Sequence, residues 1–173
     1  MTLCTTSMDG HLRVYDLVKN KMFRDVSPDI PTRIISLANE SMGDFIFCGG
    51  FDPYSIFITS IRQGGIIDNL LGHEGPVHLM QYADKLQTLI SASWDRTIKL
   101  WKPFLKGQNQ ETINMVDKII ELKVSTDDKK FFVATLRNEI HIYDVEDANV
   151  IGLVDIAKYT NSSLATPSKH MVR

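Results

Sequence analysis

The sequence predicts an all-β fold, made of just under four four-stranded antiparallel blades of a β-propeller whose ring this chain does not close. Two observations lead to this prediction. Apolar runs end at Tyr15, Ile58, Trp101 and Tyr143, spaced 43, 43 and 42 residues apart. Within each unit, short runs rich in Val, Ile, Phe, Thr and Tyr alternate with Gly, Asp, Asn and Pro, as strands alternate with turns.

A third observation specifies the kind of propeller. Gly72 and His73 precede an Ala-Ser-X-Asp turn and a strand that ends in Trp101, which is the sequence pattern of WD40 repeats. Closing such a ring takes roughly 300 residues, about seven blades of 43 residues. With 173 residues, the chain is expected to be a segment of a larger propeller or a truncated product.

The strands expected in each unit follow from the same alternation. The first unit is expected to lack its innermost strand and to hold strands at 2–7, 11–17 and 21–26. The other units are expected to hold strands at 33–38, 45–50, 55–61 and 66–71; at 77–83, 88–93, 97–102 and 111–116; and at 119–125, 131–136, 139–145 and 149–156. We place the partial propeller in residues 1–158 and expect a mobile polar tail in residues 159–173, where alternation is lost.

Composition excludes some partners. The net charge of −2 gives no general attraction to nucleic acid, so any RNA contact would be local. No apolar run is long enough to span a bilayer and no secretory signal begins the chain, so no membrane partner is expected. Cys4 and Cys48 lie inside apolar runs and are expected to be buried, reduced thiols of an intracellular protein.

The third unit carries a complete set of polar residues for a structural hydrogen-bonded tetrad: His73, Ser93, Asp95 and Trp101. We expect Asp95 to accept from His73, His73 from Ser93, and Ser93 from the Trp101 indole N–H. Counting back by the repeat puts other residues at these positions elsewhere. The Ser position holds Ser7, Gly50 and Thr135, the Asp position Asp9, Asp52 and Arg137, and the His position Ile30 and Met115. The other blades are therefore expected to depend on apolar packing.

The residue before each turn Asp position is large and apolar. This set, which we call the rim row, consists of Met8, Phe51, Trp94 and Leu136. In a propeller these positions lie along one rim, where exposed apolar groups mark a partner-binding surface. The alternative is that they pack into the next blade.

Ser93, His73 and Asp95 also match the residue types of a hydrolase triad. Ser93, however, lies inside an expected strand without a G-x-S-x-G turn, so we expect no catalytic residues and no enzyme. No Cys or His spacing indicates a metal site, and no phosphate-binding loop indicates a nucleotide, so no cofactor is expected. His11, His78, His141 and His170 are scattered and are expected to be ordinary polar residues.

Three segments in a set order carry a family resemblance: LLGHEGPV, LISASWDRTIKLWKPF and FFVATLRNEIHIYDVEDANVIGLVDI. With the weaker GGFDPYSIFITS and DGHLRVYDL upstream, the sequence resembles the periodic tryptophan protein family of WD40 proteins over roughly residues 1–158. It departs from the family pattern by keeping Trp at only one strand-ending position, Trp101.

The resemblance implies part of one of two tandem propellers in a long nucleolar protein with a helical C-terminal region. It implies a scaffold of the small-subunit processome, whose partners are other processome proteins and, within the assembled particle, U3 small nucleolar RNA with pre-rRNA, and which supports 18S rRNA maturation.

Two other function classes stay open at this stage. One is a WD40 protein-interaction module of another complex, such as a ubiquitin ligase substrate receptor, since the fold alone does not choose between them. The other is the hydrolase, which requires an accessible Ser93. Because a partial propeller has open blade edges, we also expect this fragment to associate with itself.

Overall fold

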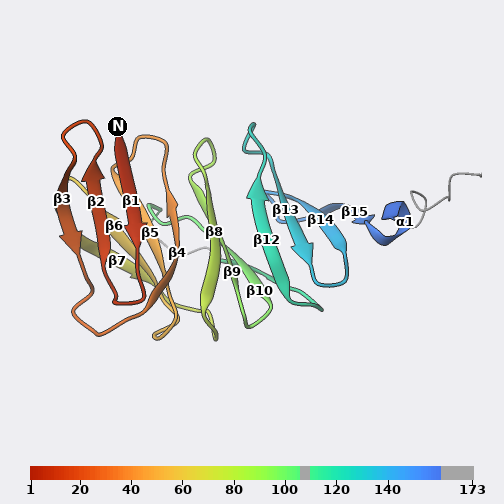
Figure 1. Ribbon diagram of the computed structural model, residues 1–173. Coiled ribbons are helices and arrows are strands. Elements are labelled where there is room, and N and C mark those ends of the chain that lie inside the picture. Colours follow the sequence, from red (N-terminus) through yellow and green to blue (C-terminus); the bar gives the residue numbers. More distant parts are fainter. Residues whose placement is uncertain (106–109, 161–173) are drawn as a thin grey trace, which may run out of the picture.

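The computed structural model describes residues 1–105 and 110–160 and shows an all-β chain of four antiparallel sheets, the blades of an unclosed propeller (Figure 1). Blade 1 consists of β1 (Thr2–Thr6), β2 (Leu12–Asp16) and β3 (Lys21–Val26). Blade 2 consists of β4 (Ile34–Asn39), β5 (Phe45–Gly50), β6 (Ile56–Ser60) and β7 (Gly65–Leu70).

Blade 3 consists of β8 (Val77–Ala83), β9 (Thr88–Ser93), β10 (Thr97–Trp101) and β11 (Glu111–Asn114). Blade 4 consists of β12 (Ile119–Val124), β13 (Lys130–Thr135), β14 (Glu139–Asp144) and β15 (Val150–Asp155). Each sheet is a meander, with strands paired in chain order. The predicted fold class is confirmed, and the predicted strands agree with the observed ones to within two residues at each end.

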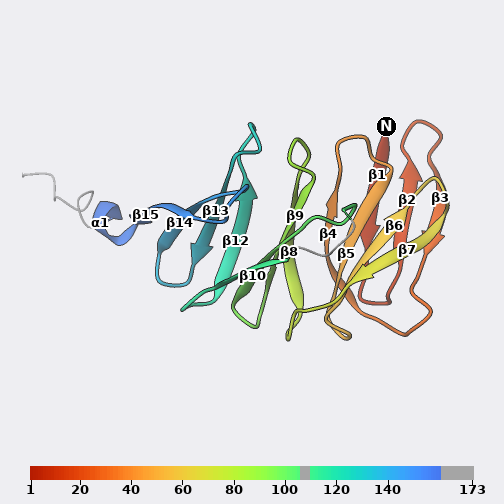
Figure 2. The same ribbon diagram turned by 180° about the vertical axis from the view of Figure 1, so that it is seen from behind.

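The blades stand side by side in chain order, with blade 1 at one end and blade 4 at the other (Figures 1 and 2). β4 contacts β8, and β8 contacts β12, so the first strands of successive blades line the same side. Blade 1 has only three strands, which leaves β1 as an edge strand. Leu3 of β1 is 46% exposed, whereas Ile46 and Leu89, one and two repeats later, are fully buried.

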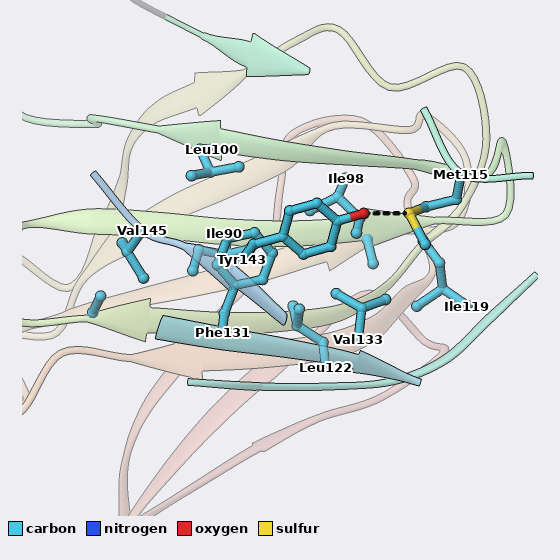
Figure 3. Packing of buried hydrophobic residues seen from close by; sticks show 12 residues of the cluster. Ile90, Ile98, Leu100, Met115, Ile119, Leu122, Phe131, Val133, Tyr143 and Val145 are labelled. Carbon is cyan, nitrogen blue, oxygen red and sulfur yellow. Dashed lines mark hydrogen bonds between the residues drawn. The ribbon is translucent and has the colours of Figure 1, made fainter. Parts of the chain in front are cut away.

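Apolar packing joins the blades through three clusters, one at each blade–blade interface. Leu12 and Val14 of blade 1 pack against Ile46 and Phe57 of blade 2. The blade 3–4 cluster is drawn in Figure 3, where side chains of β9, β10, β13 and β14 interdigitate. The last strand of each blade is largely exposed, so the core consists mainly of the inner three strands.

Hydrogen bonds that repeat with the period of the sequence fix the blades against one another. The Ser41 backbone N–H donates to Asp84 Oδ1 at 2.7 Å, and the Lys85 N–H donates to Asp128 Oδ2 at 3.0 Å, with donor and acceptor 43 residues apart in both pairs. These contacts join the turns between the first and second strands of neighbouring blades. These hydrogen bonds therefore join equivalent turns of neighbouring blades, one 43-residue repeat apart.

The chain changes structure after β15. The helical turn α1 (Ala157–Thr160) follows, begun by an Ala157 N–H bond to Asp155 Oδ1 at 3.0 Å. The sequence prediction missed this turn, which overlaps the first two residues of the predicted tail; residues 161–173 lie outside the described residues. Within the described ranges, no helix has the length and apolar character needed to cross a membrane.

Candidate functional site

A buried hydrogen-bond chain ties the segment before β8 to β9 and β10. His73 Nε2 lies 2.7 Å from Ser91 Oγ, and Trp101 Nε1 donates to the same oxygen at 2.8 Å. On the other side of the ring, His73 Nδ1 lies 3.1 Å from both Asp95 Oδ2 and Thr97 Oγ1. Thr97 also donates its hydroxyl to Asp95 Oδ1 at 2.7 Å.

The protonation state of this chain follows from burial. Burial lowers the pKa of His73 to about 4, even though Asp95 opposes the shift, so the ring is neutral at pH 7. Burial alone would raise the pKa of Asp95, but hydrogen bonds from Thr97 and from the Glu74 backbone N–H outweigh it and hold the pKa below its usual value. Because a carboxylate can only accept, His73 Nδ1 carries the proton, and Nε2 accepts from Ser91.

The sequence prediction chose the wrong serine for this tetrad. Ser91, not Ser93, lies between His73 and Trp101. The Ser93 hydroxyl instead accepts from the Asp95 backbone N–H at 3.1 Å and stabilises the turn between β9 and β10. The bond between His73 and Asp95 and the use of the Trp101 indole N–H are as expected.

The Ser91, His73 and Asp95 side chains form the same sequence of contacts as a hydrolase triad, but Ser91 is fully buried and Ser93 is 1% exposed. The Ser91 oxygen already accepts from Trp101. A substrate would have to displace this strand to reach either hydroxyl, so the arrangement stabilises the blade and offers no accessible nucleophile.

The other blades replace the tetrad with unrelated contacts. One repeat from Ser91, the equivalent positions hold Cys48 and Val133, which are buried and lack a hydroxyl. In blade 4 the Tyr143 hydroxyl donates to Met115 Sδ at 3.3 Å, inside the apolar cluster (Figure 3). These two residues stand where Trp101 and His73 stand in blade 3, so a polar chain has been replaced by packing.

The Asp positions also differ between blades. Asp9 accepts from Arg13 at 2.7 Å, and this bond lowers the pKa of Asp9 to about 2. Arg137, at the Asp position of blade 4, forms an ion pair with Asp117 at 2.8 Å. Only blade 3 therefore has the full chain of hydrogen bonds.

The rim row lies on the turns between the second and third strands of blades 2 to 4 and on the equivalent β1–β2 turn of blade 1, and most of it is exposed. Met8 is 59% exposed, Trp94 58% and Leu136 60%. Phe51 is half-buried and packs edge-on against Trp94, with ring centroids 5.6 Å apart and planes at 87°. The sequence left two alternatives for these residues, packing into the next blade or exposure to a partner. Phe51 packs against the next blade, whereas Met8, Trp94 and Leu136 are largely exposed. Their role in partner binding stays a prediction.

Trp94 and Leu136 border a pocket between blades 3 and 4, which we call the inter-blade pocket. Its volume is about 440 Å³, and it is lined by His78, Ser93, Trp94, Arg96, Lys118, Ile119, Ile120 and Leu136. A volume of this size falls in the roughly 300–1,000 Å³ range of ligand clefts. The sequence prediction assigned no binding role to the other lining residues, because their turn, linker and strand positions lie outside the tetrad and the rim row.

In residues 1–105 and 110–160, no three His, Cys, Asp or Glu side chains are grouped to hold a metal ion. Cys48 is buried and Cys4 partly buried; burial raises the pKa of both thiols, that of Cys48 to about 12. Cations, Arg96 and Lys118, lie beside the two rim-row members of blades 3 and 4, Trp94 and Leu136.

Comparison with known proteins agrees with the geometry. The family model described as "WD domain, G-beta repeat" matches residues 64–102, which cover most of blade 3. A chain in the "Crystal Structure of Mitotic Checkpoint Complex" has the same fold, with a TM-score of 0.78 over 89% of this chain and 46% of that one, at 14% identity. The chain is therefore a segment of a WD40 β-propeller.

Its sequence is similar to periodic tryptophan protein 2. It is 33% identical to the protein of Saccharomyces cerevisiae over 82% of this chain. It is 35% identical to the Dictyostelium discoideum homolog over 87% of the chain, and 33% identical to the Mus musculus homolog over 83%. The family resemblance predicted from the sequence is thereby confirmed. The chain spans only about 15–16% of the length of these relatives.

Proposed function

We propose that the chain is a non-catalytic scaffold segment that acts in ribosome biogenesis, as part of a small-subunit processome in the nucleolus. The observation that carries this proposal is the similarity to periodic tryptophan protein 2, which extends over more than four-fifths of the chain in the three relatives described. It is far longer than the stretch, residues 64–102, that matches the generic WD40 model.

The mechanism of such a scaffold is binding. The exposed members of the rim row supply apolar contact area, and Trp94 is the residue type most enriched among interface anchors. The tetrad contributes indirectly: Asp95 follows Trp94 in the same turn and Thr97 begins β10, so their bonds to His73 hold the anchor in place. The expected partners are other processome proteins and, within the assembled particle, U3 small nucleolar RNA with pre-rRNA.

Affinity purification tests the proposal. The full-length polypeptide that carries this segment would be tagged and recovered from the cells that express it, and the bound proteins and RNA identified. Processome proteins with U3 RNA support the proposal. Recovery of ubiquitin ligase subunits without U3 RNA would instead establish the alternative, a substrate receptor.

Two variants test whether the recovered partners bind at the rim row. Trp94→Ala should reduce partner recovery, whereas Met42→Ala should not. Met42 is a good control because it is 89% exposed and lies on the β4–β5 turn, at the opposite end of the strands. Equal recovery with both variants would show that the partners bind elsewhere.

A further inference from the structure

The inter-blade pocket differs from its neighbours along the rim. Between blades 2 and 3, the Phe51 and Trp94 rings pack edge to face, with centroids 5.6 Å apart. Between blades 3 and 4 the partner of Trp94 is Leu136, its equivalent 42 residues later, and a pocket of about 440 Å³ opens. The Leu136 side chain is smaller than that of Phe51, which is in contact with Trp94.

The pocket is held open by a rigid frame. His78 Nε2 donates to the Ile119 carbonyl at 3.0 Å, which ties β8 to β12 across the blade boundary. Trp94 is held between two rings, with Phe51 at 5.6 Å and His78 at 6.2 Å between centroids. A preformed pocket binds without the entropic cost of ordering its walls.

The charge at the pocket is positive. Arg96 and Lys118 line it and are exposed, and neither forms an ion pair within the described part of the chain. Among the residues that the structure describes, the Arg96 side chain donates to the Val116 carbonyl at 3.4 Å and to no carboxylate. The acidic neighbours of these two cations in the sequence have other partners: Asp117 pairs with Arg137, and Asp95 accepts from Thr97 and from the Glu74 backbone N–H.

The pocket between blades 1 and 2 occupies the same place in the repeat and has a different character. It is lined by Met8 and Phe51 together with Asp9 and Asp52. Arg33 also lines it, but its guanidinium lies 5.8 Å from the centre of the Phe51 ring. Uncompensated positive charge beside an apolar pocket is therefore a property of blades 3 and 4, not of the repeat.

We propose that the inter-blade pocket binds a protein segment in which an apolar anchor side chain is flanked by acidic residues. The anchor would lie among Trp94, Ile120 and Leu136, and the carboxylates would face Arg96 and Lys118. A peptide fits better than RNA because Trp94 is the one exposed aromatic side chain in the wall, beside the aliphatic Ile119, Ile120 and Leu136, whereas single-stranded RNA stacks successive bases on several open aromatic faces. This inference rests on the proposed function as a binding scaffold and defines the chemistry of its partner.

Fluorescence anisotropy with the purified full chain tests this inference. The probe is a short labelled peptide with one Phe between Glu residues, compared with peptides in which Phe is Ala or Glu is Lys, and with an oligouridylate RNA. The acidic Phe peptide should bind most tightly, and its affinity should fall as salt is raised. Equal binding of the Lys peptide, tighter binding of the RNA, or no binding of the acidic Phe peptide would overturn the proposal.

Variants locate the contact. Trp94→Ala should weaken peptide binding about tenfold or more, as loss of an anchor does. Lys118→Glu should weaken it by roughly three- to tenfold, while Lys21→Glu, an exposed site on β3 of blade 1, should change it less than about twofold. Equal effects of the two Lys variants would overturn the assignment even if Trp94→Ala failed to fold.

The peptide experiment contains no processome component, so its failure leaves the co-purification result standing. If the peptide binds but processome proteins and U3 RNA do not co-purify, the role in ribosome biogenesis is refuted and the peptide-binding pocket is not.

Discussion

Replacing Ser91 with Ala should destabilise the chain far more than replacing Ser93, although both serines face the same side of β9 and both are buried. Ser91 Oγ contacts His73 Nε2 at 2.7 Å and Trp101 Nε1 at 2.8 Å. Ser93 Oγ accepts one bond, from the Asp95 N–H at 3.1 Å.

The magnitudes follow from these bonds. Ser91→Ala removes two buried hydrogen bonds and leaves the indole N–H and the His73 Nε2 without partners. With about 0.5–1.5 kcal/mol for each bond and a further cost for each orphaned group, the free energy of unfolding should fall by about 2–4 kcal/mol. Ser93→Ala removes one bond at a turn and should cost about 0.5–1.5 kcal/mol.

Urea denaturation followed by tryptophan fluorescence measures both values. Trp94 and Trp101 are the only tryptophans, so a Trp94→Phe background leaves Trp101, which is inside the tetrad, as the single reporter. The m-value should stay constant, since the surface exposed on unfolding is unchanged. A cost for Ser93→Ala that equals or exceeds that of Ser91→Ala would refute the tetrad described here.

Three further predictions concern acid, the pocket and the open edge. Burial lowers the pKa of His73 from 6.5 to about 4, so between these pH values the unfolded chain binds more protons than the folded chain. The free energy of unfolding should therefore fall by up to about 3 kcal/mol as the pH drops from 6.5 to 4. Denaturation at several pH values measures this slope, and His73→Gln should flatten it. Leu136→Phe should fill the inter-blade pocket against Trp94 and abolish peptide binding in the anisotropy assay with the unfolding midpoint nearly unchanged; unchanged binding would place the ligand elsewhere. Leu3→Glu, on the edge strand β1, should shift sedimentation toward monomer, whereas Met42→Glu should not; identical shifts would exclude the β1 edge as the self-association surface.

Much of the fold was predictable because each blade of a propeller has the same order of strands and turns. The 43-residue spacing follows from four short strands and their turns, and the same alternation of apolar residues recurs in each blade. The missing inner strand of blade 1 was also predictable by counting back from Tyr15. The turn α1 was not, because Asp155 starts it through a local cap where the repeat has already ended.

The serine of the tetrad shows where the same reasoning fails. Side chains on a strand alternate, so Ser91 and Ser93 lie on one face about 6.8 Å apart, and periodicity cannot choose between them. Ser93 sits next to the turn, however, and Ser at such a position commonly bonds the backbone two residues on, as it does with Asp95 here. That local preference is the signal that would have selected Ser91.

The lining of the inter-blade pocket could not be predicted from the repeat, because the equivalent place holds an acidic pocket between blades 1 and 2 and an aromatic contact between blades 2 and 3. Equivalent rim residues meet in pairs, and the outcome depends on both members: Phe51 and Trp94 touch, whereas Trp94 and Leu136 leave a space. The cations beside it, Arg96 and Lys118, come from a turn and a linker in different blades. In a protein built from equivalent units, the conserved period produces a common scaffold, and binding specificity can arise only where neighbouring units differ.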